Sequence, residues 1–236
     1  MKIGRQIIRP TLVLTAITVA SVFLLSHVER LAGPIIIKRA RQKQEAALSL
    51  VLPGYIVLSS RTIAVDGVEF TYWEAEKKVE NRTVRAYAFL TKGTGYGGDM
   101  VMMAGVDEKG EVLGLSIISQ SETPGLGDRC LEVADRETLW DHLKGGIPER
   151  DFSDATRIPW FQNQFKGLDA NEKIQIVKRG DWEPGMRDGL LEINAISAIT
   201  GATITSAGVV RGLESGLDRL RRAREAAAAE QTGGIR

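Results

Sequence analysis

The sequence is poor in the side chains that build most metal sites and thiol redox sites. Its 236 residues include a single cysteine, Cys130, and two histidines, His27 and His142. One cysteine excludes an internal disulfide and any metal site that needs several cysteines. The histidines lack the HExxH spacing or any similar arrangement of ligands. We therefore expect Cys130 to be a small buried apolar residue and His142 to lie on a helix surface.

An excess of charge of one sign is also lacking. The chain carries 31 lysine and arginine residues against 30 aspartate and glutamate residues, a formal net charge of +1. Without a basic field, nucleic acid is not an expected partner. No GxSxG or SxxK sequence supplies an activated nucleophile, so a hydrolase held on the membrane has no visible catalytic set.

The N-terminal region contains one long apolar segment. Residues 11–28 include no charged side chain, and with Ile7 and Ile8 the segment reaches about twenty residues, enough to cross roughly 30 Å of hydrocarbon. This length predicts a retained transmembrane anchor. A cleavable signal peptide is the alternative, with residues 31–34 as a weak match to a cleavage site. Basic residues stand on both sides of the segment, so charge does not settle its orientation.

The rest of the chain favours an α+β fold. Strands are predicted over residues 55–60, 62–65, 68–74, 83–91, 101–106, 112–119 and 173–178, with a hairpin turn at 107–110 and a loop at 181–189. Helices are predicted over residues 131–143 and 207–229. One face of the second helix carries Val209, Val210, Leu213, Leu217 and Leu220. We expect a single N-terminal transmembrane helix followed by one mixed, mainly antiparallel sheet domain with packed helices. The tryptophans are expected in the core or at an interface: Trp73, Trp140, Trp160 and Trp182.

A segment rich in hydroxyl groups precedes the last predicted helix. Gly201 and Ala202 leave space around the backbone, and four side chains present hydroxyls: Thr200, Thr203, Thr205 and Ser206. The first N–H groups of a helix are unpaired and carry partial positive charge, so a phosphate would be stabilised there. The alternative is a simple helix cap, which needs one hydroxyl and leaves the others unexplained.

Two further segments are rich in small residues. One consists of Glu122, Thr123, Pro124, Gly125, Leu126 and Gly127, and taken alone it is a tight turn after a strand. The other, residues 93–98, satisfies the GxGxxG pattern and contains Tyr96 and Gly97. A dinucleotide site requires a helix after that pattern, whereas a strand is predicted here. Its glycines would let the backbone approach a flat ring, and Tyr96 could pack nearby.

The order and spacing of these segments resemble the FMN-binding subunits of ion-pumping respiratory complexes. The resemblance covers roughly residues 85–215 and includes the stretch at residues 164–167. Together with the single anchor, it favours the G subunit of the Rnf electron-transport complex. The C subunit of the sodium-pumping NADH:quinone reductase, which is usually longer, is the alternative. A cofactor-free membrane-anchored scaffold or assembly factor is a further alternative, but it leaves the three segments unrelated.

The resemblance implies that FMN is esterified to Thr203 by a separate flavin transferase that uses FAD and magnesium. It places the segments at Tyr96 and Gly97 and at Glu122 to Gly127 beside the flavin ring, although Glu122 could instead hold a loop in place. Family members often carry an aspartate six residues before the acceptor, where Ser197 stands here, and Asn194 is the nearest polar residue upstream.

The resemblance also implies a location and partners. The chain would be a single-pass protein of the bacterial inner membrane, in contact with lipid and with other membrane subunits of the complex. It would be a redox subunit rather than an independent enzyme. The implied division is a cytoplasmic N-terminus and anchor (residues 1–28), a juxtamembrane helix (29–54), a periplasmic FMN-binding domain (55–230) and a disordered tail (231–236).

Overall fold

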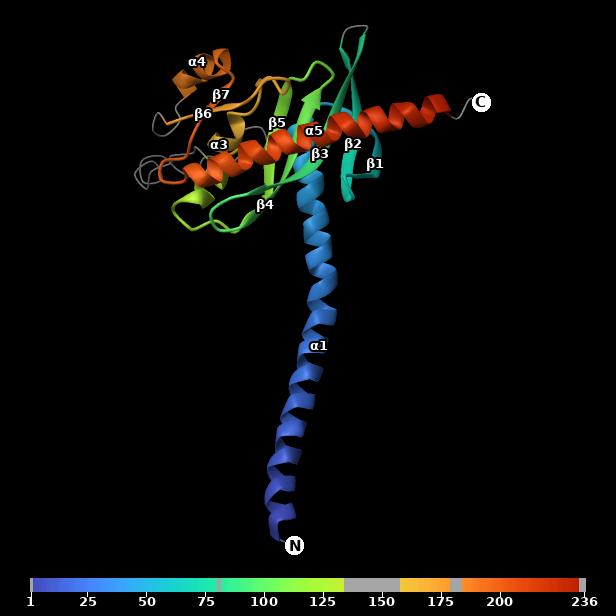
Figure 1. Cartoon of the computed structure of the whole chain (residues 1–236), viewed down its shortest axis with the longest axis vertical. Coiled ribbons are helices and arrows are strands. Elements are labelled where there is room, and N and C mark those ends of the chain that lie inside the picture. Colours follow the sequence, from blue (N-terminus) through green and yellow to red (C-terminus); the bar gives the residue numbers. More distant parts are fainter. Residues whose placement is uncertain (1, 80–81, 134–157, 179–183, 234–236) are drawn as a thin grey trace, which may run out of the picture. The chain divides into compact units, whose positions relative to one another are not determined.

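The computed structural model describes residues 2–79, 82–133, 158–178 and 184–233 (Figure 1). The chain forms two compact units, Met1–Glu45 and Ala46–Arg236. Trp140, His142 and Trp182, and most of the helix predicted over residues 131–143, lie outside the described residues.

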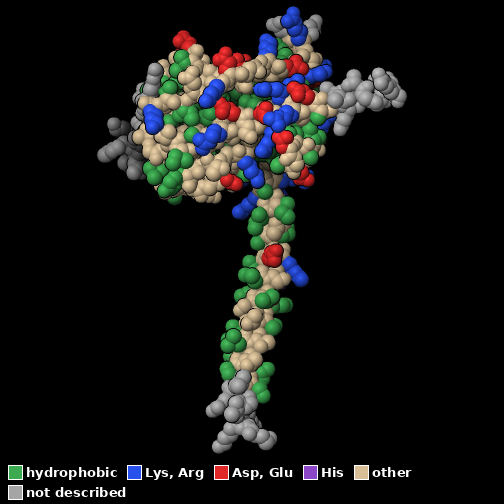
Figure 2. Space-filling view, viewed as in Figure 1, with side chains coloured by type: hydrophobic (Ala, Val, Ile, Leu, Met, Phe, Trp, Pro, Cys, Tyr) green, Lys and Arg blue, Asp and Glu red, His purple; other side chains and the backbone are tan. Residues whose placement is uncertain are grey.

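The first unit is helical. Helix α1 (Lys2–Val51) is continuous through Pro10 and Pro34, so it includes both the predicted anchor and most of the predicted juxtamembrane helix. One proline removes a single backbone hydrogen bond, whereas a helix end would leave four carbonyls unpaired. Figure 2 shows hydrophobic side chains along this helix, and Phe23 and Leu25 are 73% and 74% exposed. Among the described residues, it is the one helix whose length and composition would allow it to cross a membrane.

Two threonine hydroxyls within the apolar segment of α1 are bonded to the helix itself. The hydroxyls of Thr15 and Thr18 donate to the carbonyls of Thr11 and Leu14, each at 2.9 Å. A hydroxyl bonded in this way presents little unsatisfied polarity to its surroundings. The threonines are therefore compatible with an apolar environment around this part of the helix.

The second unit is built on a five-stranded antiparallel sheet. Its strands follow the chain order β1 (Ile56–Val65), β2 (Val68–Val79), β3 (Arg82–Thr94), β4 (Asp99–Asp107) and β5 (Val112–Ser119). Strands predicted over residues 55–60 and 62–65 form one strand with a register shift between Val57 and Ser59. A β-bulge of this kind lets a strand continue past an irregular position.

Shorter elements follow the sheet, and the predicted α+β fold is confirmed. They are η1 (Gly127–Leu131), α3 (Trp160–Asn163), β6 (Gln175–Val177), η3 (Pro184–Met186), α4 (Arg187–Glu192) and β7 (Ala195–Ser197). Strand β6 pairs in parallel with β7. Residues 132 and 133 are not helical, and residues 184–189 are not a loop, so both predictions are wrong there. The buried Leu190 explains the second case, because it fixes α4 against the domain.

The last helix is longer than predicted at both ends. Helix α5 (Thr203–Gly233) begins four residues earlier than predicted and includes residues 231–233, which were expected to be disordered. At its start, the Ala202 carbonyl accepts from the Ser206 N–H at 3.1 Å. The predicted apolar face is confirmed, because all five of its residues are buried: Val209, Val210, Leu213, Leu217 and Leu220.

The sheet is covered on both faces. One face carries the larger core, in which α5 packs over Phe70, Tyr72 and Phe89. On the other face, Val51 and Leu52 pack with a second cluster, which consists of Ala47, Trp73, Ala75, Ala86, Ala88 and Met103. Alternate residues of β2 and β3 therefore enter opposite cores, as strand geometry requires. Trp73 and Trp160 are buried, which confirms their predicted place in the core.

Glycines allow α5 to lie unusually close to β3. Gly208, Gly212 and Gly216 are spaced four residues apart and so share one face of the helix. A Cβ atom at Gly208 would collide with the Thr94 carbonyl, and one at Gly212 would lie 2.8 Å from the Cα atom of Gly93. The buried Thr91 hydroxyl donates to the Gly212 carbonyl at 2.7 Å. The contact between α5 and β3 is therefore made by backbone.

We expect Gly208→Ala to lower the free energy of unfolding by about 1–3 kcal/mol, because the added methyl group overfills the contact. Alanine in an open helical position normally stabilises by about 0.5–1 kcal/mol. Gly189→Ala is the matched control, since nothing lies within 4 Å of a Cβ atom there. Thermal melts followed by circular dichroism should show opposite signs for the two variants. An equal gain in both would contradict the close packing.

Candidate cofactor site

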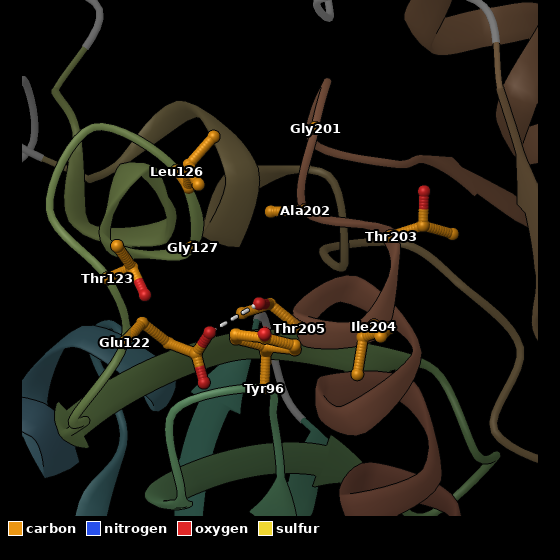
Figure 3. A pocket seen from close by; sticks show the side chains of 10 residues that line it. All are labelled: Tyr96, Glu122, Thr123, Leu126, Gly127, Gly201, Ala202, Thr203, Ile204 and Thr205. Carbon is orange, nitrogen blue, oxygen red and sulfur yellow. Dashed lines mark hydrogen bonds between the residues drawn. The ribbon is translucent and has the colours of Figure 1, made fainter.

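Three segments far apart in the sequence line one pocket. Its volume is about 410 Å³, within the usual range of small-molecule sites. Figure 3 shows the residues that line it: Tyr96, Glu122, Thr123, Leu126, Gly127, Gly201, Ala202, Thr203, Ile204 and Thr205. The loop after β3, the loop after β5 and the start of α5 each contribute. The fold thus brings the three segments of small residues together.

A buried carboxylate joins the three segments. Glu122 is 7% exposed, and its Oε2 accepts from the hydroxyl of Thr205 at 2.6 Å (Figure 3). Its Oε1 accepts from the backbone N–H of Gly97 at 3.1 Å. The Glu122 N–H donates to the side chain of Gln120. Hydrogen bonds to an ionised acceptor are the stronger kind in proteins, so Glu122 holds both loops against α5.

Gly95 and Gly127 leave the space that the Glu122 carboxylate occupies. A Cβ atom at Gly95 would collide with Oε1 of Glu122, and one at Gly127 would collide with Oε2. At Gly127 it would also lie 2.7 Å from Oγ1 of Thr205. Within residues 93–98, Gly95 is therefore explained by packing against Glu122, whereas Gly93 packs against Gly208 of α5. The GxGxxG pattern is followed by β4 and not by a helix, as predicted, which excludes a dinucleotide fold there.

The four hydroxyls before α5 have different surroundings. Thr205 is 1% exposed and bonded to Glu122. Ser206 is fully buried, accepts from the Ile199 N–H at 3.0 Å and donates to the Ala202 carbonyl at 3.1 Å. Thr200 is exposed and Thr203 is half-buried. Figure 3 shows Thr203 at the rim, with its side chain away from Glu122. Thr203 thus combines an accessible hydroxyl with a place on the pocket wall.

The first turn of α5 presents backbone donors. The first backbone hydrogen bond into the helix runs from the Ser206 N–H to the Ala202 carbonyl. In the described part of the chain, the N–H groups of Thr203, Ile204 and Thr205 have no acceptor. Such groups, with the helix dipole, stabilise an anion at this position. A phosphate on Thr203 would lie beside them.

Apolar side chains at the pocket are exposed to solvent. Tyr96, Leu126 and Ile204 are 75%, 46% and 54% exposed. Three exposed large side chains around one pocket are suited to cover a flat apolar ring. Sequence reasoning missed Ile204, because it stands among hydroxyl residues and its exposure depends on where α5 begins.

Some of the predicted site residues do not line the pocket. Gly97 acts through its bond to Glu122, and Ser206 is fixed within the helix cap. Pro124, Gly125 and Thr200 are exposed and lie outside the lining set. Gly125 has a φ of +76°, which favours glycine at that turn. Whether these residues contact a cofactor stays a prediction.

The residues upstream of Thr203 hold backbone segments of the domain together. Ser197 is buried in β7, and its N–H donates to Oε1 of Gln164 at 2.7 Å. Asn194 accepts from the Asp169 N–H at 2.9 Å and donates to the Asp169 carbonyl at 3.0 Å. Both residues fix neighbouring backbone segments. The stretch at residues 164–167 is therefore tied to the strand that leads into the hydroxyl-rich segment.

Cys130 is a small buried residue, as predicted. It is fully buried and free. Burial, together with the nearby carboxylates of Glu122 and Asp128, raises the pKa of its thiol to about 12. A thiol with such a pKa remains protonated and unreactive at neutral pH.

Known protein families include one that matches the part of the chain that forms this pocket. Residues 95–218, more than half of the chain, match the family described as the FMN-binding domain. The chain belongs to the FMN-binding domain family. This confirms the family resemblance indicated by the three segments, and it supports FMN as the cofactor of the domain.

Relatives of this FMN-binding chain include the G subunits of ion-translocating complexes. The G subunit of the ion-translocating oxidoreductase complex of Haemophilus influenzae is 40% identical over 98 residues, covering 38% of this chain and 45% of that protein. The G subunit of the Na(+)-translocating ferredoxin:NAD(+) oxidoreductase complex of Acetobacterium woodii is 31% identical over 134 residues, covering 56% and 48%. The matched region thus spans about half the length of these relatives.

A solved structure with a similar fold is the C subunit of the Na(+)-translocating NADH-quinone reductase from Parabacteroides distasonis. It is 18% identical, has a TM-score of 0.47, and covers 77% of this chain and 92% of that chain.

The pocket of this FMN-binding domain fits the chemistry of FMN. Three donors of the first turn of α5 suit the phosphate, while Leu126, Ile204 and Tyr96 suit the apolar ring. Gly201 has a φ of +79°, and a Cβ atom there would lie 3.2 Å from Leu126. The bound flavin would supply reversible acceptance of electrons, and the chain supplies position and surroundings.

We expect Thr205→Val to lower the free energy of unfolding by about 1–3 kcal/mol, because Glu122 would lose a donor in a buried place. Thr62→Val is the control: its hydroxyl bonds Thr71 at 3.0 Å on the surface, so its effect should stay within about 0.5 kcal/mol. Denaturant titrations of the flavin-free protein measure both. Equal stability of Thr205→Val and wild type would contradict the role given to Glu122.

We expect alkylation of Cys130 by iodoacetamide at pH 9 to be very slow in the folded protein and fast in urea. With the pKa raised from 9.0 to about 12, the folded thiol is about one-thousandth ionised at that pH. Since the folded pKa lies above the unfolded one, this thiol's contribution to stability is complete below pH 9.0 and is lost as the pH rises towards 12. Mass spectrometry measures the labelling, with Cys130→Ala as the blank. Rapid labelling of folded protein would refute the raised pKa.

Proposed function

We propose that the chain is the membrane-anchored, FMN-carrying electron-transfer subunit of an Rnf-type ion-translocating complex, and that FMN is esterified to Thr203. The observation that carries the proposal is the pocket in which all three family segments meet at the start of α5. The names of the related G subunits support the type of complex.

The surroundings of the hydroxyls support Thr203 as the acceptor. Thr205 and Ser206 are buried and engaged in hydrogen bonds, so neither is open to a modifying enzyme. Thr200 is exposed but does not line the pocket. Thr203 alone among the four is accessible, lines the pocket and stands at the first residue of α5.

Attachment is a phosphoryl transfer to the Thr203 hydroxyl. The bond from Oγ1 of Thr203 to phosphorus forms while the pyrophosphate bond of FAD breaks, and AMP leaves. A threonine hydroxyl is a weak nucleophile and needs a base to take its proton. Among the residues that the structure describes, no histidine or cysteine lines the pocket at Thr203, and its one carboxylate, Glu122, already accepts from the Thr205 hydroxyl and the Gly97 N–H. A separate flavin transferase with magnesium therefore supplies the activation.

The tether gives the domain a permanent redox group at a fixed place. An ester to Thr203 keeps the phosphate beside the donors of the first helical turn, and Glu122 keeps both ring-side loops against α5. Helix α1 holds the domain at the inner membrane among the other subunits of the complex. We further propose that the domain faces the periplasm.

A pocket of this kind would also suit the C subunit of a sodium-pumping NADH:quinone reductase. That the chain is such a C subunit is therefore the second candidate function. A cofactor-free scaffold gives no reason for a pocket in which exposed apolar side chains stand beside unpaired helix donors.

We expect Thr203→Ala to abolish protein-bound flavin when the full chain is expressed with a flavin transferase, because the acceptor oxygen is gone. Fluorescence in a denaturing gel and the intact mass of the chain measure attachment. Wild-type protein should be heavier by one FMN less one water.

Two variants control this experiment. Thr203→Ser keeps a hydroxyl and should retain at least some flavin, and Thr62→Ala, on the surface of β1, should retain all of it. Flavin that persists in Thr203→Ala and disappears in Thr200→Ala would move the ester to Thr200 and overturn the assignment.

A further inference from the structure

A second pocket lies between the sheet and the C-terminal part of α5. Its volume is about 510 Å³, and it shares no lining residue with the pocket at Thr203. Its lining includes Tyr72 of β2 and Tyr87 of β3. Strand pairing places Arg61 of β1 directly opposite Tyr72, so these side chains share the face that α5 covers.

The pocket has an excess of positive charge. Four arginines line it from three elements of the sheet and helix: Arg61, Arg85, Arg221 and Arg224. Two carboxylates, Glu74 and Glu225, are also present, which leaves a formal net charge of +2 (four minus two). Figure 2 shows basic and acidic side chains mixed over the face of the domain that carries α5.

These arginines are only partly engaged. The Nε of Arg61 lies 3.5 Å from Oε1 of Glu74, and the guanidinium of Arg224 lies 4.1 Å from the centre of the Tyr87 ring. Within the described part of the chain, Arg85 and Arg221 form no ion pair. Guanidinium groups that converge without matching carboxylates are arranged as in sites for oxygen-rich anions.

A buried hydroxyl in the same pocket also lacks a partner. Tyr72 is fully buried, and its hydroxyl has no hydrogen-bond partner among the described residues. A buried hydroxyl without a partner costs stability, and such groups call for an explanation. Burial raises the pKa of Tyr72, with the Glu74 carboxylate adding to the effect, so its hydroxyl stays protonated and can donate. An anion in the pocket would accept that hydrogen bond.

We propose that this pocket binds a phosphate-bearing ligand through Arg85, Arg221 and the hydroxyl of Tyr72. A tetrahedral phosphate offers three or four acceptor oxygens, which suits donors that come from β2, β3 and α5 at once, whereas a carboxylate offers two. A dianionic phosphate also matches the net charge of the pocket. The volume leaves room for an organic group attached to the phosphate.

The test is calorimetric titration of the FMN-loaded full chain in a neutral detergent at constant ionic strength. One arm uses glycerol 3-phosphate, and the other uses dihexanoyl phosphatidylglycerol below its micelle concentration. Saturable binding of either probe is expected. Tighter binding of glycerol 3-phosphate identifies a soluble phosphate as the ligand, and tighter binding of the lipid identifies a headgroup.

Three variants make the result specific. Arg221→Ala should weaken binding about tenfold or more, and Tyr72→Phe several-fold, since each removes a donor to a charged acceptor. Arg222→Ala is the matched control: it is the next residue on α5, but it pairs with Asp66 at 2.9 Å and Asp218 at 2.7 Å and does not line the pocket. It should bind as wild type does.

The melting temperature of Tyr72→Phe without probe gives a second readout. It should equal or exceed that of wild type, because the hydroxyl has no partner to lose. Absence of saturable binding to wild type, equal weakening by Arg222→Ala and Arg221→Ala, or a marked fall in the melting temperature of Tyr72→Phe would each overturn the proposal. None of these outcomes bears on Thr203, because the two pockets are lined by different residues.

Discussion

The architecture depends on the backbone contact between α5 and β3. Without side chains at Gly208 and Gly212, the helix lies directly against Gly93 and Thr94. The buried Thr91 hydroxyl adds a bond to a helix carbonyl. Because a close-packed interior cannot deform to admit extra atoms, this contact fixes the position of the helix along the strand. Both ends of α5 are then placed by one interaction.

The two pockets are consequences of that placement. At its first turn, α5 brings Thr203 and its unpaired N–H groups to the loops that follow β3 and β5. About 30 Å further along the helix, Arg221 and Arg224 reach Tyr72 and the strands at the sheet edge. A single helix thus carries the acceptor of the proposed flavin ester and part of the proposed phosphate site.

At the first pocket, Glu122 engages one threonine hydroxyl in the framework and leaves another accessible. Its carboxylate uses the Thr205 hydroxyl and the Gly97 N–H, and so it removes Thr205 from the groups open to modification. Thr203, two residues earlier, points to the rim (Figure 3). Successive residues of a helix point about 100° apart, which is why one hydroxyl can hold the framework while another remains accessible.

The sequence by itself determined the α+β class, the strands with their alternating residues, the apolar face of α5 and the three segments of small residues. These are local patterns, and local patterns follow from backbone geometry and side-chain period. Tertiary structure alone decided that Glu122 joins the three segments, that α4 forms where a loop was expected, and that Arg85, Arg221 and Tyr72 meet. Such contacts join residues distant in the chain, so their chemistry exists only once packing has brought them together.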